Sequence, residues 1–197
     1  MTTTRPSLPP LPPLPSLPPL PSDVAELLRA VDAPPRLVAH LALVAEVAER
    51  IAEFCVGQGL DLDRAAVRFG AATHDIGKAV HPEELSAPGS AHEPAGYALL
   101  LAHGVPEPLA RFARSHATWC EPGTTTEELL VSLADKAWKN QRVQDLEDRV
   151  VDRLAAATGR ERWEAFLALD DLLTRIGEDA PRRLARQAAH PVRTGRN

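Results

Sequence analysis

The sequence has few of the features that mark disulfide-rich or membrane proteins. Its 197 residues contain two cysteines, Cys55 and Cys120, which form neither a disulfide framework nor a zinc-ligand spacing. No stretch approaches the roughly 18 apolar residues that a membrane span needs. The N-terminus lacks the basic region and apolar run of a signal peptide. We therefore expect a cytoplasmic protein that has no membrane partner.

Aromatic residues and excess positive charge are also scarce. Aromatics make up 4% of the chain and hydrophobic residues 44%, so alanine, leucine and valine must fill the core, which suits closely packed helices. The net charge of -5 argues against stable nucleic-acid binding, because phosphates require a basic surface. No segment shows the alternation of a strand. We predict an all-α fold with one substantial core.

Composition divides the chain into three regions. Residues 1–22 are proline-rich, and proline fixes φ and removes amide donors, so we expect a polyproline or disordered segment. This segment is either a spacer or a docking site for a partner with an aromatic groove. Residues 23–178 have helical periodicity and are predicted to form a helical bundle. Residues 179–197 contain five arginines and no acidic residue after Pro181, and we expect a solvated basic tail.

The apolar periodicity and the terminating glycines and prolines place the individual helices. Ser90 and Glu93 match a capping box, but Pro94 fits better at a first helical position with Glu93 as the cap. The loop before it contains a short turn near His81 and Pro82. The predicted helices cover residues 22–31, 36–56, 63–75, 93–101, 106–116, 124–138, 143–157 and 161–176.

Several ligand-type side chains lie where these helices should bury apolar residues. His40 falls on the apolar stripe of its helix, and His116 follows Leu109 and Phe112 at helical spacing. Asp135 stands in an apolar run, where a carboxylate is costly to bury unless it is paired or bound to a metal. These positions indicate polar groups that face the interior of the bundle.

The dipeptide His74-Asp75, within Ala-Ala-Thr-His-Asp-Ile-Gly-Lys, provides a nitrogen and an oxygen ligand from consecutive residues. Gly70, one turn earlier, leaves room beside this dipeptide. Each ligand-type residue has an ordinary explanation when taken alone: a hydrogen-bonded core histidine, a helix-end histidine, or an ion pair of Asp135 with Arg142. The order His, His-Asp, His, His, Asp along separate predicted helices instead indicates a metal centre.

This order resembles the HD superfamily of metal-dependent phosphohydrolases, from His40 to Lys139. The most specific matches are His-Asp-Ile-Gly-Lys, His-Glu-Pro-Ala-Gly-Tyr and Ser-Leu-Ala-Asp-Lys. The region 74–96 also resembles phosphodiesterases of the HD-GYP type, but the segment around His116 lacks their paired histidines and Gly-Tyr-Pro signature. This difference argues against cyclic di-GMP as a substrate. The spacing is closer to small bacterial HD hydrolases, including those that cleave diadenosine tetraphosphate.

The resemblance implies an HD-domain helical bundle that holds two divalent metal ions. Iron or manganese is preferred, while cobalt, nickel or zinc also fit a ligand set without thiolates. One ion would be held by four residues, the second would add two histidines, and Asp75 would bridge them. The implied ligands are His40, His74, Asp75 and Asp135 for the first ion, with His92 and His116 for the second.

Two further residues have roles that follow from the same resemblance. Lys78 is expected to act with Asp75 in catalysis by contacting a phosphate oxygen; the alternative is a cation at a helix end that faces solvent. Glu93 would orient His92 by accepting a hydrogen bond, or would cap its helix.

The function implied is hydrolysis of a phosphate ester or phosphoanhydride in a nucleotide or a similar small molecule, by a metal-activated hydroxide. Two alternatives stay open. Some HD proteins with the same ligand set are mixed-valent di-iron oxygenases, and the ligands alone do not separate these reactions. A non-enzymatic adaptor, docked to a partner through its proline-rich segment, is the third hypothesis.

Overall fold

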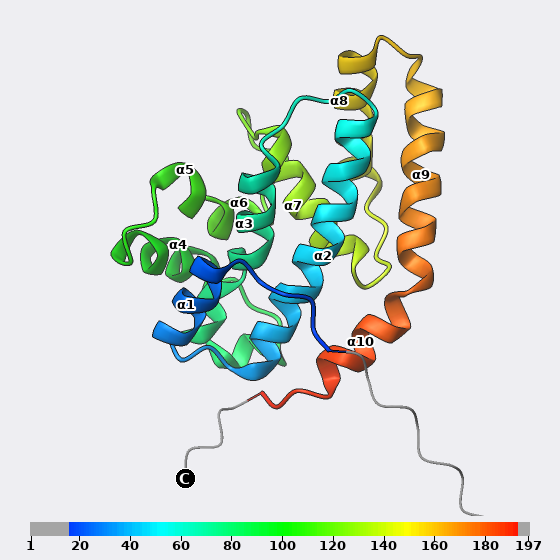
Figure 1. Cartoon of the computed structure of the whole chain (residues 1–197). Coiled ribbons are helices and arrows are strands. Elements are labelled where there is room, and N and C mark those ends of the chain that lie inside the picture. The colour runs from blue at the N-terminus through cyan, green and yellow to red at the C-terminus, as the bar shows by residue number, and fades with distance from the viewer. Residues whose placement is uncertain (1–15, 193–197) are drawn as a thin grey trace, which may run out of the picture.

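The computed structural model describes residues 16–192, and every regular element in that range is helical, which confirms the all-α prediction (Figure 1). The predicted helices are all present, with changes at some of their ends. In chain order the elements are α1 (Ser22–Ala30), α2 (Pro35–Gly57), α3 (Arg64–Thr73), the 3-10 turns η1 (Ile76–Ala79) and η2 (Pro82–Leu85), α4 (His92–Ala102), α5 (Glu107–Ala110), α6 (Phe112–Ser115), α7 (Thr126–Ala137), α8 (Gln144–Thr158), α9 (Arg162–Glu178) and α10 (Ala180–Ala188).

Helix α2 forms the centre of the molecule (Figure 1). It starts with Pro35, whose fixed φ suits a first helical position, and it packs against α3, α7 and α10. Every residue from Ala39 to Ala45 is buried, so this part of the helix is enclosed on all sides and His40 lies in the core. Neither α2 nor any other helix in residues 16–192 is long and apolar enough to cross a lipid bilayer.

Side-chain caps fix the starts of the two other helices that lead into the core. Asp63 precedes α3, and its Oδ1 accepts a hydrogen bond from the amide of Ala66 at 3.0 Å. Thr125 and Glu128 form a reciprocal capping box at the start of α7. Such caps satisfy amides that have no partner within the helix.

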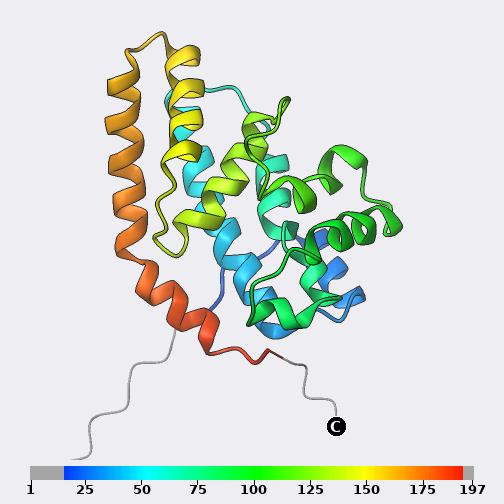
Figure 2. The same ribbon diagram turned by 180° about the vertical axis from the view of Figure 1, so that it is seen from behind.

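Helices α8 and α9 form an antiparallel hairpin along one side of the molecule, as both views show (Figure 2). Gly159 ends α8 with φ of +66°, a left-handed conformation that glycine adopts without a steric cost. The hairpin packs against α7. It therefore supports from outside one of the helices that build the core.

The start of α4 differs from the prediction. The helix begins at His92, and neither Ser90 nor Glu93 caps it with a side chain. The carboxylate of Glu84 instead accepts hydrogen bonds from the amides of Ala91 at 3.0 Å and His92 at 3.1 Å. A residue from the preceding turn thus satisfies the first amides of α4, which a local sequence motif does not reveal.

Two other predicted helices have different ends. The helix predicted over 63–75 stops at Thr73, so His74 and Asp75 lie in the turn that joins α3 to η1. The helix predicted over 106–116 is divided into the short helices α5 and α6. In both cases a histidine lies just after a helix end rather than within a helix.

Part of the region expected to be a solvated basic tail is helix α10, which packs against α2 and α9. Arg183 is buried, and it donates hydrogen bonds to the carbonyl of Trp138 at 2.7 Å and to that of Ile176 at 2.6 Å. Carbonyls at helix C-termini have no partner within their own helix. Arg183 therefore joins the ends of α7 and α9, which a count of charges does not show.

The proline-rich region lies mostly outside the described residues. Residues 16–21 form no helix or strand, and Pro21 has φ of -52° and ψ of 144°, close to polyproline geometry. Figure 1 shows this segment running from α10 to α1. The expectation of disorder for residues 1–15 falls outside the described residues.

Replacing Arg183 by alanine should lower the free energy of unfolding by about 2 kcal/mol or more, because two buried carbonyls lose a charged donor. Arg182, the neighbouring exposed residue, is the control, and its alanine variant should stay within about 0.5 kcal/mol of the original chain. Urea denaturation measures both. Equal losses in the two variants would contradict the bracing role of Arg183.

Candidate metal centre

The six predicted ligand residues come together in the structure, as two neighbouring groups of three buried side chains. Each side chain is buried, with 0% to 7% of its residue exposed. Three helices, two helix ends and one turn contribute them. His40 comes from α2, His74 from the C-cap of α3, Asp75 from the start of η1, His92 from the first position of α4, His116 from the C-cap of α6, and Asp135 from α7.

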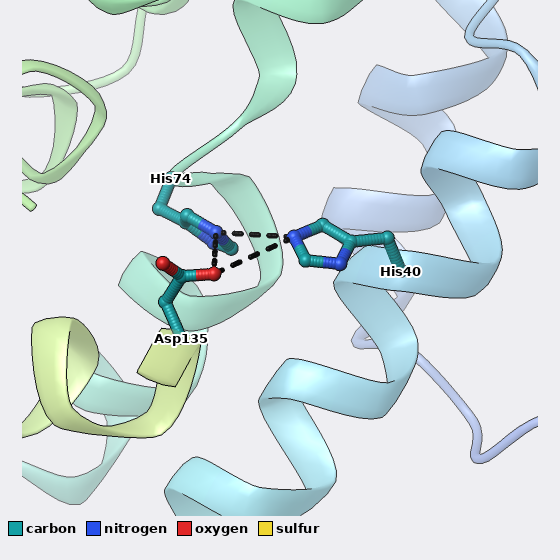
Figure 3. A group of neighbouring side chains, drawn as sticks. All are labelled: His40, His74 and Asp135. Carbon is teal, nitrogen blue, oxygen red and sulfur yellow. Dashed lines mark hydrogen bonds and ion pairs between the residues drawn. The ribbon is translucent and has the colours of Figure 1, made fainter. Parts of the chain in front are cut away.

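The first group of side chains consists of His40, His74 and Asp135 (Figure 3). Their ligand atoms all lie within 4.8 Å of one another. Nε2 of His40 and Nε2 of His74 are 3.4 Å apart. Oδ1 of Asp135 lies 3.9 Å from Nε2 of His40 and 3.7 Å from Nε2 of His74. Three donors, from α2, from the end of α3 and from α7, thus converge on one point.

The second group consists of Asp75, His92 and His116, and it meets the same distance criterion. Asp75 also connects the two groups, because its two oxygens face different histidines. Oδ1 lies 3.0 Å from Nε2 of His92 and 3.5 Å from that of His116. Oδ2 lies 3.1 Å from Nε2 of His40 and 3.6 Å from that of His74. One carboxylate therefore presents one oxygen to each group.

Hydrogen bonds on the outer nitrogens orient three of the four imidazoles. Nδ1 of His74 lies 2.9 Å from the carbonyl of Ala71, and Nδ1 of His116 lies 3.1 Å from that of Ala113. A carbonyl only accepts, so each Nδ1 donates a proton, and in the neutral ring this leaves the lone pair on Nε2. That tautomer is the one in which a histidine binds a metal through Nε2.

His92 is oriented by Glu84, a residue that the sequence analysis did not single out. Its Nδ1 hydrogen-bonds to Oε2 of Glu84, the same carboxylate that accepts the first amides of α4. Glu93, predicted for this role, lines the nearby cavity instead. Because Glu84 and His92 are connected only through the fold of the intervening loop, their spacing along the chain carried no signal.

Close backbone approach places His92 beside Asp75. A Cβ added to Gly77 would lie 1.9 Å from the carbonyl oxygen of His92 and 2.6 Å from the amide of Gly96. Only glycine lets η1 and α4 come this close. The glycine of the His-Asp-Ile-Gly-Lys motif therefore helps to bring the two groups together.

Gly70 has a different role from the one predicted. A Cβ there would lie 2.6 Å from the ring of Phe112, so the space beside this glycine is filled by an aromatic side chain. Phe112 starts α6, which ends just before His116. Gly70 thus allows α6 to pack closely on α3, and this packing brings His116 to His74, whose ring centroids are 5.0 Å apart.

The protonation states of three of the ligand-type residues suit cation binding. Burial alone would raise the pKa of Asp75, but His74 and the neighbouring histidines lower it well below its usual range. Burial alone would also raise the pKa of Asp135, but His74 and Lys136 lower it well below its usual range. Burial lowers the pKa of His116 to about 4. At neutral pH both carboxylates are charged and His116 is neutral, as metal ligands must be.

Two lysines accompany the two carboxylates. Nζ of Lys78 lies 2.5 Å from Oδ2 of Asp75, and Nζ of Lys136 lies 2.7 Å from Oδ2 of Asp135. Their side chains are 18% and 17% exposed, so Lys78 is a partly buried residue of the site rather than a helix-end cation in solvent. Asp135 does not pair with Arg142, which binds Glu147 and Asp170 instead.

A cavity of about 370 Å³ opens beside these groups. It gives the ligand side chains access to a small molecule from outside the core. Besides five of the six predicted ligands, its lining includes Lys78, Glu84, Leu85, Gly89, Glu93, Ala117, Lys136, Trp138, Lys139 and Gln187.

The donor set fits divalent metal ions on two observations. Nε2 of His92 is buried, and although Oδ1 of Asp75 lies 3.0 Å away, the two atoms do not have the geometry of a hydrogen bond; a bound cation would satisfy this nitrogen. The 3.4 Å between Nε2 of His40 and Nε2 of His74 is close to the roughly 3.3 Å between two nitrogens that each lie about 2.0–2.1 Å from one tetrahedral ion.

Comparison with protein families agrees with this geometry. The model of the HD domain family matches residues 37–154, more than half of the chain. The chain therefore belongs to the HD domain family, whose members are generally metal-dependent phosphohydrolases acting on small molecules. Searches of curated proteins and of solved structures gave no significant match.

Gly77→Ala should destabilise the protein by about 2–4 kcal/mol, because the added methyl group meets backbone atoms that have no room to move. Gly57→Ala is the matched control, since a Cβ there meets no atom within 4 Å. Urea denaturation should show a loss in the first variant and little change or a gain in the second. A stable Gly77→Ala variant would contradict the close contact between η1 and α4.

Glu84→Gln should weaken metal binding by roughly 10-fold to 100-fold, the range found when the partner of a ligating histidine is lost. An amide has only one acceptor oxygen for the three donors that Glu84 serves. Glu83→Gln is the control, because Glu83 is exposed and its carboxylate pairs with His81 outside the ligand groups. Manganese titration followed by calorimetry measures both variants, and equal affinities would exclude the positioning role of Glu84.

Proposed function

We propose that this protein is a hydrolase with a two-metal centre, which cleaves a phosphate ester or phosphoanhydride of a nucleotide or a similar small molecule. The observation that carries the proposal is the position of Asp75, with one carboxylate oxygen toward each histidine group. A bridging carboxylate of this kind keeps two cations at a short distance. His40, His74 and Asp135 would hold one ion, and His92 and His116 the other.

The metal ions, when bound, would supply an activated hydroxide and would offset negative charge on the phosphate. The protein side chains have separate tasks. Glu84, Ala71 and Ala113 hold imidazoles in the orientation that presents Nε2. Lys78, within hydrogen-bond distance of Asp75, is placed to bind an oxygen of the phosphate at the centre.

Iron or manganese is the proposed metal pair. Imidazole and carboxylate donors suit both, and no thiolate is close enough to favour a softer ion. Cys55 is buried in the hydrophobic core, where burial raises its pKa to about 12, and Cys120 is exposed outside the cavity. Both thiols are therefore excluded from the proposed ligand set.

Asp75→Asn should remove most of the bound metal and lower phosphate release by at least about 100-fold, because the bridge loses its charge. The assay is metal-dependent phosphate release from a panel of nucleotides under anaerobic conditions, with metal content measured on the same samples. Asp61→Asn, on an exposed residue before α3, is the control for removing one carboxylate.

Three outcomes would count against this proposal. Full activity in Asp75→Asn would exclude the metal bridge as part of the reaction. Metal binding without phosphate release, combined with oxygen consumption on a cyclitol or phosphonate substrate, would favour the oxygenase. A chain that binds no metal would exclude both enzymatic readings.

A further inference from the structure

All three lysines of the chain line the same cavity. The only lysines among the 197 residues are Lys78, Lys136 and Lys139. The chain has 22 lysines and arginines in total, so all the others are arginines. The three lie beside the metal-ligand groups described above. Everywhere else on the molecule, arginine provides the positive charge.

Lysine and arginine present different cationic groups to a ligand in a cavity. The lysine ammonium is a compact point charge with three donors on a flexible stem, whereas the guanidinium is a broad planar fork. A cavity of about 370 Å³ that must also admit a substrate favours the smaller head group. The confinement of lysine to this cavity therefore indicates a requirement of the site rather than of the surface.

Lys139 differs from the other two lysines because it has no carboxylate partner. Lys78 and Lys136 each lie within hydrogen-bond distance of an aspartate of the centre. Lys139 makes no ion pair or side-chain hydrogen bond with any residue from 16 to 192. Its charge is therefore available to a ligand in the cavity.

The turn that carries Lys139 is held from behind by the C-terminal helices. The preceding carbonyl, of Trp138, accepts the hydrogen bond from Arg183. The residue after Lys139 is Asn140, which has φ of +59°. Its Oδ1 lies so close to α9 that a Cβ added to Gly177 would be only 2.3 Å from it. The backbone on both sides of Lys139 therefore lies against the C-terminal helices, through Arg183 of α10 and Gly177 of α9.

We propose that Lys139, with Gln187 of α10 beside the same cavity, binds a second phosphate group of the substrate. This proposal rests on the proposed phosphohydrolase function and narrows its substrate to diphosphates and longer phosphoanhydrides. A lone phosphate is already provided for by the metal centre and by Lys78, so a phosphomonoester leaves Lys139 without a partner. A second, linked phosphate supplies that partner, and an ammonium and an amide both donate to its oxygens.

The test compares two inert probes on the full chain loaded with manganese: methylphosphonate, with one phosphorus group, and methylenediphosphonate, with two. Isothermal titration calorimetry gives both dissociation constants for the original chain and for Lys139→Gln. Metal content is measured after each titration to check whether either probe has removed manganese. Arg182→Gln, which removes one exposed positive charge of α10 outside the cavity, is the matched control.

Lys139→Gln should weaken methylenediphosphonate binding about 10-fold, equal to about 1.4 kcal/mol, and should change methylphosphonate binding less than about twofold. Arg182→Gln should change neither. An equal loss for both probes, no loss for either, or no binding of the diphosphonate to the original chain would overturn the subsite.

The same samples separate this proposal from the proposed function. A chain that hydrolyses phosphate esters but shows no selective loss in Lys139→Gln would overturn the subsite alone. A chain that binds the diphosphonate through Lys139, yet releases no phosphate from any nucleotide, would contradict hydrolysis and would support the subsite as a binding site.

Discussion

The carboxylate of Asp75 is buried where α2, α3, α4 and α6 meet, and a buried charge is costly unless opposite charges and donors surround it. Four imidazoles and one ammonium do so here. His74 and Lys78 are close to Asp75 in the sequence, whereas His40, His92 and His116 come from three distant parts of the chain. The helices therefore cannot shift independently, because any shift would leave this carboxylate without one of its partners.

Much of this centre could be predicted from the sequence because its ligands follow local rules. His40 and Asp135 occupy core positions of regular helices, and His74-Asp75 lies in a short motif, so periodicity and motif together indicated the residues. Glu84 and Arg183 could not be found in this way. Each acts on a helix end that is distant in sequence, and such contacts exist only after the chain has folded.

Small side chains are what let these helices approach closely enough. The chain has few aromatic residues, and alanine is common among the buried residues of α2, α3 and α7. Where the ring of Phe112 is inserted between helices, Gly70 faces it. The distance between helices sets the distance between the candidate ligand atoms, so packing with small residues also determines the geometry of the candidate metal centre.

The distribution of lysines also determines where reagents that react with amines can modify the protein. Acetylation, succinylation and crosslinking through N-hydroxysuccinimide esters all act on primary amines, and apart from the N-terminus the chain offers them only at the cavity. Cellular lysine acylation and laboratory labelling would thus act on the same few atoms. A mass shift on a lysine peptide of this protein therefore reports that an amine beside the cavity was accessible to the reagent.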